Sequence, residues 1–484
     1  MSNTTMTIDL YEFTMGQTYF DTGKKDQIFY FDIFFRKNPF QGGYTVMGGL
    51  DSIVDYVNNF KIEDDDIEYL RSLGLFTEDY LEYLRNIRFD GDIWAIPDGT
   101  PIFPNEPIIT VRCKAICAQL LETALLACFN HGALVVTAAK RITEQAAGRP
   151  VMEFGARRGR GIDSSNEASK LAYIGGCSGT SNVFAGKKHN IPVLGTMAHS
   201  MIMEADSEYD AFLDFAKSNP NNCVFLVDTY DTLKKGIPNA IKVADEYLTP
   251  NGIPFKGIRI DSGDLAYLSK EARKMLDAAG YPNATICLSN GLNEYTISSL
   301  LAQGTVVDSF GVGDNIAASK EILGGVYKLA AIERNNEVIP KIKVSNDAIK
   351  VTNPGYKKVY RFFDNETGYA LGDVIAKADE EIPTDGYTLI SPDHFWKRTE
   401  IDNYTVRELQ VQVFKDGTQV YTVPSIKESQ AYCNEQMATL YPETKRLYNP
   451  NEHYVDLSMP LLKLKHQLIE EHTGKSFGKG YIYD

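Results

Sequence analysis

Short apolar runs alternate with helical patterns over residues 151–314, and each run ends in a small polar cluster rich in glycine. The clusters are residues 153–158, 195–200, 227–231, 259–264, 289–292 and 311–314. If the runs are parallel strands, all the clusters lie at carboxyl ends of strands. Parallel barrels and open parallel sheets hold their active sites at that edge. The pattern therefore predicts an α/β enzyme whose site draws on several strand ends.

The hydrophobic pattern on either side of this region is mixed. Before it, we expect a helix over residues 9–19 capped by Asp9, a strand over 27–35, helices over 50–60 and 64–84, short antiparallel strands over 91–112 and a helix over 120–131. After about Leu323, we expect paired strands over 327–350, β segments over 359–363 and 387–412, and helices over 426–440 and 459–472. These flanking parts predict separate α/β and C-terminal units.

Two helices inside the repeat have clear signals. Ser164 with Glu167 three residues later predicts a capping box at a helix start. Apolar residues recur at helical spacing over 265–279, and Gly280 ends that pattern. The short apolar run 285–288 predicts a buried strand.

Composition narrows the function classes. The chain has 484 residues and a net charge of −15, which argues against nucleic acid as a partner. The longest apolar region, residues 115–129, is interrupted by Gln119 and Glu122 and is shorter than the ~20 residues that span a bilayer, so we expect no membrane segment. The N-terminus has no signal pattern. The 7 scattered cysteines favour free thiols in a reducing cytoplasm.

Glycines at successive strand ends suggest a phosphate site. Gly291, Gly311 and Gly313 let backbone amides approach a ligand, and such amides bind phosphate. Each glycine alone is explained equally well by a tight turn, but loops of this kind on neighbouring strands favour phosphate.

Charged residues at the other strand ends suggest catalysis. Arg157 and Arg259 suit carboxylate or phosphate ligands. Asp264 is explained as a helix N-cap, whereas Asp261 is a candidate for ribose hydroxyls or a metal-bound phosphate. His199, at the end of an apolar run, is either a structural residue or an acid–base group or nucleophile. Residues 227–232 faintly resemble the ribose-phosphate loop of type I phosphoribosyltransferases, but the acidic pair is missing.

In this order, the clusters resemble the nicotinate phosphoribosyltransferases of the type II phosphoribosyltransferase family. The resemblance covers nearly the whole chain. Its motifs are residues 9–15, 34–44, 154–158, 179–182, 195–200, 227–231 and 261–264. Together these motifs are specific, although no single one would suffice.

The resemblance implies an activity. The family joins nicotinate to 5-phosphoribosyl 1-pyrophosphate (PRPP), with Mg²⁺, and couples the reaction to ATP hydrolysis as ATP phosphorylates a histidine. It implies an irregular parallel (β/α) barrel over residues 136–329. An N-terminal α/β domain over 1–135, completed by about 330–400, and a C-terminal extension over 401–484 would flank it. It also implies a homodimer with shared active sites.

Carried over one position at a time, the resemblance assigns residues to the base and to ATP. His199 matches the phosphorylated histidine. Phe154 matches the aromatic that stacks on the pyridine ring, and Tyr11 matches the tyrosine that closes the ring's other side from the partner subunit. Arg157 and Arg259 match arginines near the base and the phosphate.

The remaining matches concern the phosphoribosyl group. Asp261 matches the acid beside the ribose, and Arg36 matches more loosely a basic residue near the nucleotide or pyrophosphate. The 5′-phosphate loops are matched by Ser289, Asn290, Gly291, Gly313 and Asp314.

Ser181 bears on the choice of base. Nicotinamide-using relatives place an aspartate at the matching position, where it would repel a carboxylate, so Ser181 with a nearby arginine favours nicotinate. The alternatives are a nicotinamide or quinolinate phosphoribosyltransferase, a sugar-phosphate lyase or isomerase on a barrel, and a catalytically silent phosphoribosyl-binding protein.

Overall fold

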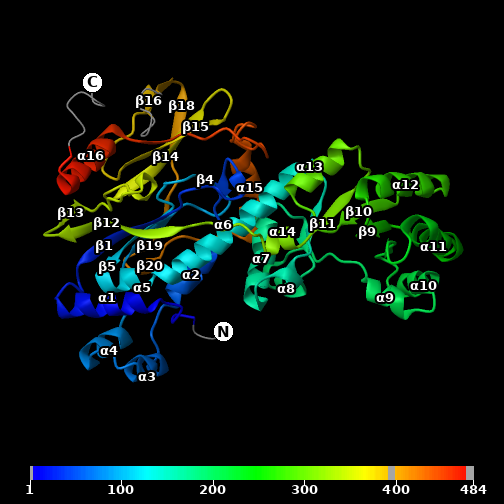
Figure 1. The fold of residues 1–484 in the computed structure, drawn as a ribbon, viewed down its shortest axis with the longest axis horizontal. Coiled ribbons are helices and arrows are strands. Elements are labelled where there is room, and N and C mark those ends of the chain that lie inside the picture. Colours follow the sequence, from blue (N-terminus) through cyan, green and yellow to red (C-terminus); the bar gives the residue numbers. More distant parts are fainter. Residues whose placement is uncertain (1–3, 391–397, 476–484) are drawn as a thin grey trace. The chain divides into compact units, whose positions relative to one another are not determined.

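The computed structural model describes residues 4–390 and 398–475 (Figure 1). The chain forms two compact units. One comprises Met1–Leu134 with Glu321–Asp484, and the other comprises Val135–Lys320.

The unit Val135–Lys320 is built on a six-stranded sheet with the order β7-β6-β11-β10-β9-β8. Its strands are β6 (Val151–Glu153), β7 (Gly179–Thr180), β8 (Val224–Leu226), β9 (Gly257–Ile260), β10 (Thr285–Ser289) and β11 (Ser309–Val312). Every pairing within it is parallel. Apolar residues such as Ile258, Ile286 and Phe310 are fully buried, which explains why the strands read as apolar runs.

Helices connect these strands. They are α7 (Ile162–Ile174), α8 (Val183–His189), α9 (His199–Glu204), α10 (Glu208–Ser218), α11 (Ile237–Val243), α12 (Leu265–Ala278), α13 (Glu294–Ala302) and α14 (Asp314–Ala317). The alternation of strand and helix confirms the predicted α/β class, including strand β10 and helix α12 with its Asp264 cap. Among the described residues no pairing joins β7 to β8, so a parallel sheet is observed and a closed barrel is not.

Two local predictions in this unit are wrong. The capping box at Ser164 does not form, because α7 begins earlier, at Ile162, after Gly161 in a left-handed conformation (φ 112°). The apolar run before Gly195 is not a strand but contributes a single bridge between Thr180 and Val193.

The other unit contains a seven-stranded sheet with the order β13-β12-β1-β5-β3-β19-β20. These strands are β1 (Ile28–Phe34), β3 (Asp92–Ala95), β5 (Ile109–Lys114), β12 (Val326–Arg334), β13 (Glu337–Pro340), β19 (Val411–Lys415) and β20 (Thr418–Gln419). Helices α1 (Leu10–Asp21), α2 (Leu50–Asn58), α3 (Asp64–Ser72), α4 (Glu78–Arg85) and α5 (Ala115–Leu120) belong to the same unit. The helix predicted over 64–84 is two helices, because the chain turns at Gly74 (φ 66°).

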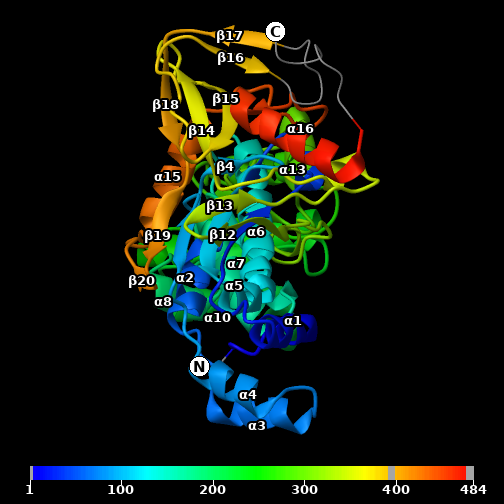
Figure 2. The same cartoon turned by 90° about the vertical axis from the view of Figure 1, so that its left-hand side faces the viewer.

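A four-stranded sheet, β18-β14-β15-β21, completes this unit. Its strands are β14 (Lys357–Asp364), β15 (Ala370–Lys377), β18 (Tyr404–Glu408) and β21 (Val455–Leu457). Short pairs β2 (Thr45–Val46) with β4 (Pro101–Ile102) and β16 (Tyr387–Ile390) with β17 (Arg398–Ile401), and helix α15 (Ile426–Ala438), lie in the same unit. Figure 2 shows α16 (Met459–Thr473) beside β15, where Ile375, Leu461 and Leu462 form a small core.

The helix predicted over 120–131 is longer than expected. Helices α5 and α6 (Glu122–Gln145) follow one another over 31 residues, Ala115–Gln145, long and apolar enough to cross a bilayer by length and composition. However, 56% of the most apolar 18-residue stretch of this helix is buried inside the protein. A core helix passes the same test, so this helix carries no argument for a membrane.

Candidate active site

A cavity of about 330 Å³ lies at the carboxyl edge of the parallel sheet, within the unit Val135–Lys320. It is lined by Phe154, Ala156, Arg157, Ser181, residues 195–199, Leu226, Arg259 and Asp261. The structure thus brings together the candidates Phe154, Arg157, His199, Arg259 and Asp261, from three of the predicted clusters, and Ser181, which follows β7.

Phe154 follows β6 directly. Its backbone N–H donates to the Val312 carbonyl at 2.7 Å, which continues the pairing of β6 with β11. A Cβ atom on Gly311 would lie 2.6 Å from the Phe154 ring, so the glycine makes room for the aromatic side chain. The Arg259 guanidinium carbon lies 5.2 Å from the ring centre. Packing on a neighbouring strand therefore fixes the orientation of this ring.

A buried carboxylate supports the turn that carries Phe154. Glu153 accepts hydrogen bonds from the Gly155 N–H and from the Thr180 hydroxyl, the latter at 2.6 Å. The Glu153 carbonyl accepts from the Ser181 N–H at 2.9 Å. Burial raises the pKa of the Glu153 carboxyl above its usual value. One residue thus joins the two strand ends that present Phe154 and Ser181.

Arg259, Asp261 and Ser289 form a hydrogen-bonded group. Arg259 Nε donates to Ser289 Oγ at 2.8 Å, and Arg259 Nη2 donates to Asp261 Oδ1 at 3.0 Å. Ser289 Oγ in turn donates to Asp261 Oδ1. The group joins the ends of β9 and β10, and it holds a carboxylate and a guanidinium beside the cavity.

His199 is the first residue of α9, and its side chain is 39% exposed. Its Nδ1 lies 3.0 Å from Thr229 Oγ1. Its Nε2 lies 3.9 Å from Asp261 Oδ2 and 4.0 Å from Asp228 Oδ1. One ring nitrogen is thus held by a hydroxyl, and the other faces two carboxylates. Such a held imidazole can act as a nucleophile or as an acid–base group.

The sequence interpretation missed three polar residues at this site. The Asp228 side chain is 1% exposed, and its Oδ1 has no hydrogen-bond partner among the described residues, while Oδ2 accepts from Ser262 Oγ at 2.5 Å. The Thr196 hydroxyl is also buried without a partner in the described chain, and Thr229 holds His199. All three stand in the strand-end clusters, but only the folded arrangement singles them out.

The predicted phosphate loops lie at the ends of β10 and β11, which are neighbours in the sheet. Asn290 (φ 99°) and Gly291 (φ 57°) adopt left-handed conformations, and Asn315 Nδ2 donates to the Gly291 carbonyl at 3.2 Å. Gly313 precedes α14, and Asp314 is exposed on its first turn. None of these residues lines the cavity itself. Ser289 is connected to it through the hydrogen bond that it accepts from Arg259.

Tyr11 and Arg36 lie in the other unit. Tyr11, on α1, is 45% exposed, and partial burial and then Glu122 raise the pKa of its hydroxyl. Arg36 Nε donates to the Ile349 carbonyl at 3.0 Å. Burial lowers the pKa of Lys328; the charges of Lys343 and Arg36 lower it further, whereas Glu122 raises it. Arg36, Lys328 and Lys343, of which only Arg36 was predicted, are called the cationic cluster below because the charges of Arg36 and Lys343 act on Lys328.

The comparisons with known proteins cover almost the whole chain. Family models match at residues 6–130 (nicotinate phosphoribosyltransferase N-terminal domain), 150–364 (nicotinate phosphoribosyltransferase family) and 356–465 (nicotinate phosphoribosyltransferase C-terminal domain). The chain is 42% identical to nicotinate phosphoribosyltransferase of Bacillus subtilis (strain 168), over 96% of this chain and 94% of that protein.

A plant relative and a solved structure agree with this match. Nicotinate phosphoribosyltransferase 2 of Arabidopsis thaliana is 36% identical over 95% of this chain and 93% of its own length. The crystal structure of human nicotinic acid phosphoribosyltransferase superimposes with a TM-score of 0.83 and 28% identity, covering 95% of this chain and 99% of that one.

Proposed function

The chain belongs to the nicotinate phosphoribosyltransferase family, and we propose on that premise that it joins nicotinate to PRPP, giving nicotinate mononucleotide and pyrophosphate for NAD salvage. The observation that carries the proposal is the single cavity into which Phe154, Ser181, His199 and Asp261 converge. A flat aromatic acid, a ribose and a transferable phosphoryl group each find a matching side chain there.

In the proposed reaction, the pyridine nitrogen attacks C1 of the ribose while the C1–O bond to pyrophosphate breaks. The departing oxygen keeps the bonding pair, and the ribose passes through an oxocarbenium-like state. The Phe154 ring holds the base by stacking, and Arg157 and the Thr196 hydroxyl suit its carboxylate. Asp261 offers negative charge beside the developing cation. Positioning and electrostatics therefore supply most of the catalysis.

The buried carboxylate oxygens suit Mg²⁺. The unpartnered Oδ1 of Asp228 and the Asp261 carboxylate are hard oxygen donors beside the same cavity. The described residues contain no group of three His, Cys, Asp or Glu that would hold a metal unaided, so substrate phosphates would complete the coordination. Bound there, the ion would neutralise charge on pyrophosphate.

We infer that His199 is the residue that couples ATP. Because Thr229 holds Nδ1, Nε2 is the nitrogen presented to the cavity. In the proposed step Nε2 takes the γ-phosphoryl group of ATP, ADP leaves, and later hydrolysis of the phosphohistidine returns the free imidazole and phosphate. The phosphoryl group would bring about two negative charges next to Asp228 and Asp261, which favours cation and pyrophosphate binding at the cavity.

We propose that the functional enzyme is a homodimer with shared sites. Tyr11 and the cationic cluster of Arg36, Lys328 and Lys343 lie in the unit formed by residues 1–134 and 321–484, and Tyr11 is half-exposed. The family resemblance places the tyrosine in the partner's site, where it closes the base slot, and matches Arg36 loosely to a basic residue near the nucleotide or pyrophosphate. We propose that Lys328 and Lys343 join Arg36 in holding pyrophosphate.

We further infer an irregular barrel. Val193 bridges to Thr180 at the end of β7, and Asn222 Nδ2 near β8 donates to the Gly195 carbonyl at 2.9 Å. Residues 193–199 would thus fill the gap between β7 and β8, the two edge strands of the parallel sheet. The 7 cysteines form no disulfide with one another in the described chain, which supports the proposal of a reducing cytoplasmic location.

The test is nicotinate-dependent release of pyrophosphate from PRPP, measured with and without ATP and with nicotinamide or quinolinate in place of nicotinate. Ser181 is exposed and lines the cavity, and its side chain has no negative charge that would repel the carboxylate of nicotinate. It therefore favours nicotinate as the base. Preferential turnover of another base would overturn the substrate assignment. Ligand binding without pyrophosphate release would overturn the enzymatic one.

A further inference from the structure

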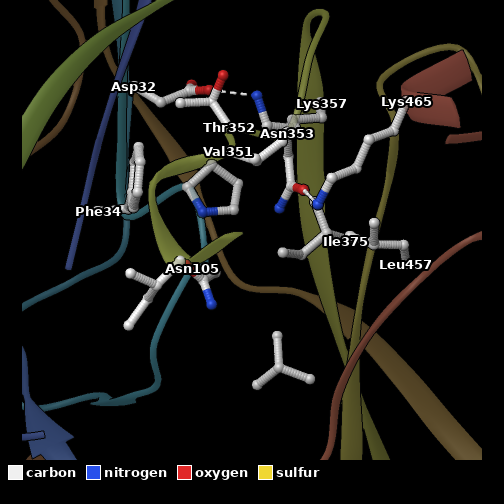
Figure 3. Close-up of a pocket in the computed structure, with 13 residues that line it drawn as sticks. Asp32, Phe34, Asn105, Val351, Thr352, Asn353, Lys357, Ile375, Leu457 and Lys465 are labelled. Atoms are coloured by element: carbon white, nitrogen blue, oxygen red, sulfur yellow. Dashed lines mark hydrogen bonds and ion pairs between the residues drawn. The ribbon is translucent and has the colours of Figure 1, made fainter. Parts of the chain in front are cut away.

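The unit formed by residues 1–134 and 321–484 contains a cavity of its own, of about 340 Å³. This volume lies within the range of small-molecule pockets. Strands β1, β14, β15 and β21, residues 349–353 and helix α16 contribute to its walls (Figure 3). None of the active-site candidates lines it. The cavity is therefore lined by residues other than those assigned to the reaction described above.

One wall carries a buried ion pair. Lys357 Nζ donates to Asp32 Oδ2, and the two side chains are 2% and 4% exposed. Asp32 Oδ1 also accepts from the Thr110 hydroxyl at 2.8 Å, and Lys357 Nζ donates to the Gly355 carbonyl at 3.1 Å. These additional hydrogen bonds fix both charges in place. The pair is thus a rigid polar wall whose charges cancel.

A second ammonium group lies across the cavity. Lys465 reaches from α16 to Asn353, and its Nζ donates to Asn353 Oδ1 at 2.9 Å (Figure 3). Asn105 also lines the cavity from a loop, with its backbone in a left-handed conformation (φ 69°) fixed by a hydrogen bond to the Phe35 carbonyl. The charged side chains that line the cavity are thus two cations, Lys357 and Lys465, and one anion, Asp32, beside two amide side chains.

The remaining lining is apolar. Ile375 on β15 and Val455 and Leu457 on β21 face the cavity together with Phe34 and Pro107. A cavity lined by two cations and one anion, with amide groups and an aliphatic floor, suits a small organic anion with an apolar body. Charge-assisted hydrogen bonds would hold the anionic end, and the aliphatic floor would cover the body.

The wall of this cavity also supports the cationic cluster. The Ile349 carbonyl accepts from Arg36 Nε at 3.0 Å. The buried Thr352 accepts from the Lys343 N–H at 2.9 Å, and its own N–H donates to the Lys343 carbonyl at 3.3 Å. Residues 349 and 351–353 thus line the cavity, and the same segment contacts the Arg36 side chain and the Lys343 backbone. A ligand that fixes this segment fixes the Arg36 guanidinium and the backbone that carries Lys343.

We propose that this cavity binds a small organic anion and that its occupancy strengthens binding of the phosphoribosyl donor. The site itself follows from the lining of the cavity. The coupling rests on the proposed function, in which the cluster holds pyrophosphate.

Hexanoate is the probe, with 1-hexanol as the neutral control, and binding is followed by saturation-transfer NMR on the full chain without substrates. The expected dissociation constant for hexanoate is on the order of 1 mM, typical of so small a ligand. The binding of 1-hexanol should be weaker. Equal binding of both probes would overturn the site.

Two variants locate the binding. Lys465→Met removes the ammonium but keeps the aliphatic stem, and it should weaken hexanoate binding roughly tenfold because a hydrogen bond to a charged group is lost. Val455→Phe should abolish binding by filling the cavity. Lys463→Met is the matched control, since Lys463 lies on the same helix outside the cavity, and it should bind as wild type. Unchanged binding in both cavity variants would place hexanoate elsewhere.

Steady-state kinetics test the coupling. Saturating hexanoate should lower the KM for PRPP at least twofold in wild type and Lys463→Met, but not in Lys465→Met. An unchanged KM in a protein that binds hexanoate would refute the coupling and leave the site standing. Because binding is measured without substrates, its outcome stays separate from any failure of the proposed transferase activity.

Discussion

The guanidinium carbon of Arg259 lies 5.2 Å from the centre of the Phe154 ring. The same guanidinium donates to Ser289 and Asp261, so the aromatic side chain assigned to the base and the carboxylate assigned to the ribose are tied to one cation. This arrangement holds the Phe154 ring and the Asp261 carboxylate, from two strand ends, in a fixed relation. The predictions below test its parts.

Phe154→Leu should raise the KM for nicotinate roughly three- to tenfold, since an aromatic contact is worth about 0.5–1.5 kcal/mol beyond its buried area. The effect on kcat should be smaller. Phe184→Leu, on α8 and 55% exposed, is the control and should behave as wild type. An unchanged KM in initial-rate measurements on Phe154→Leu would exclude the stacking role.

His199→Asn should abolish stimulation by ATP and leave slow, ATP-independent transfer. The physical reason is that the variant has no nitrogen that can take a phosphoryl group, while the base and ribose contacts remain. The measurement is ADP formation alongside nicotinate mononucleotide formation. Undiminished ATP hydrolysis in the variant would show that another group carries the phosphoryl.

Asp228→Asn should slow phosphorylation of His199 by roughly 10- to 100-fold in single-turnover measurements with labelled ATP. The substitution preserves shape but removes a buried charge 4.0 Å from His199 Nε2, and a charged group near a developing charge contributes about 1.5–3 kcal/mol. Asp214→Asn, at an exposed position on α10, is the control. Equal rates in the two variants would make Asp228 a purely structural residue.

Tyr11→Ala and Arg259→Ala should each be nearly inactive alone, and a mixture of the two should regain activity. If sites are shared between subunits, a mixed dimer contains one site with neither substitution. The expected recovery is about a quarter of wild-type activity at equal amounts with free exchange. Mass spectrometry should confirm exchange, and its presence without recovered activity would argue against a shared site.

Glu12 should make the protein less stable as pH rises from about 4.5 to 7. The buried Glu12 carboxyl has its pKa raised from 4.5 to about 7, first by burial. The protonated form is therefore favoured in the folded state. The stability that protonated Glu12 contributes is fully present below pH 4.5 and is lost as pH rises through about 7. The shift corresponds to about 3 kcal/mol at most.

Calorimetry at pH 5 and pH 8 checks this. Glu12→Gln should show a smaller drop in Tm between the two pH values than wild type, because glutamine does not ionise. An identical drop would show that other groups dominate in this range.

The sequence by itself determined the repeating part of the fold. Parallel strands buried on both faces read as apolar runs, and residues that follow such a strand lie at its carboxyl end whatever the rest of the chain does. For this reason Phe154, Arg259 and Asp261 were selected from local pattern and family resemblance. His199 was selected in the same way, although the run before it is not a strand, and the structure places all four around one cavity. Helix ends were less predictable, as the break at Gly74 shows.

Only the tertiary structure decided which strand ends meet. Asp228 stands in a cluster that looked like an incomplete phosphate loop. Its place at the candidate site became visible only because β8 is the neighbour of β9, and its Oδ1 lies 4.0 Å from His199 Nε2. Likewise, β19 pairs with β3 across more than half the chain. Local periodicity reports the burial of each segment, but hydrogen bonds between distant segments depend on how their surfaces pack, which no short stretch of sequence records.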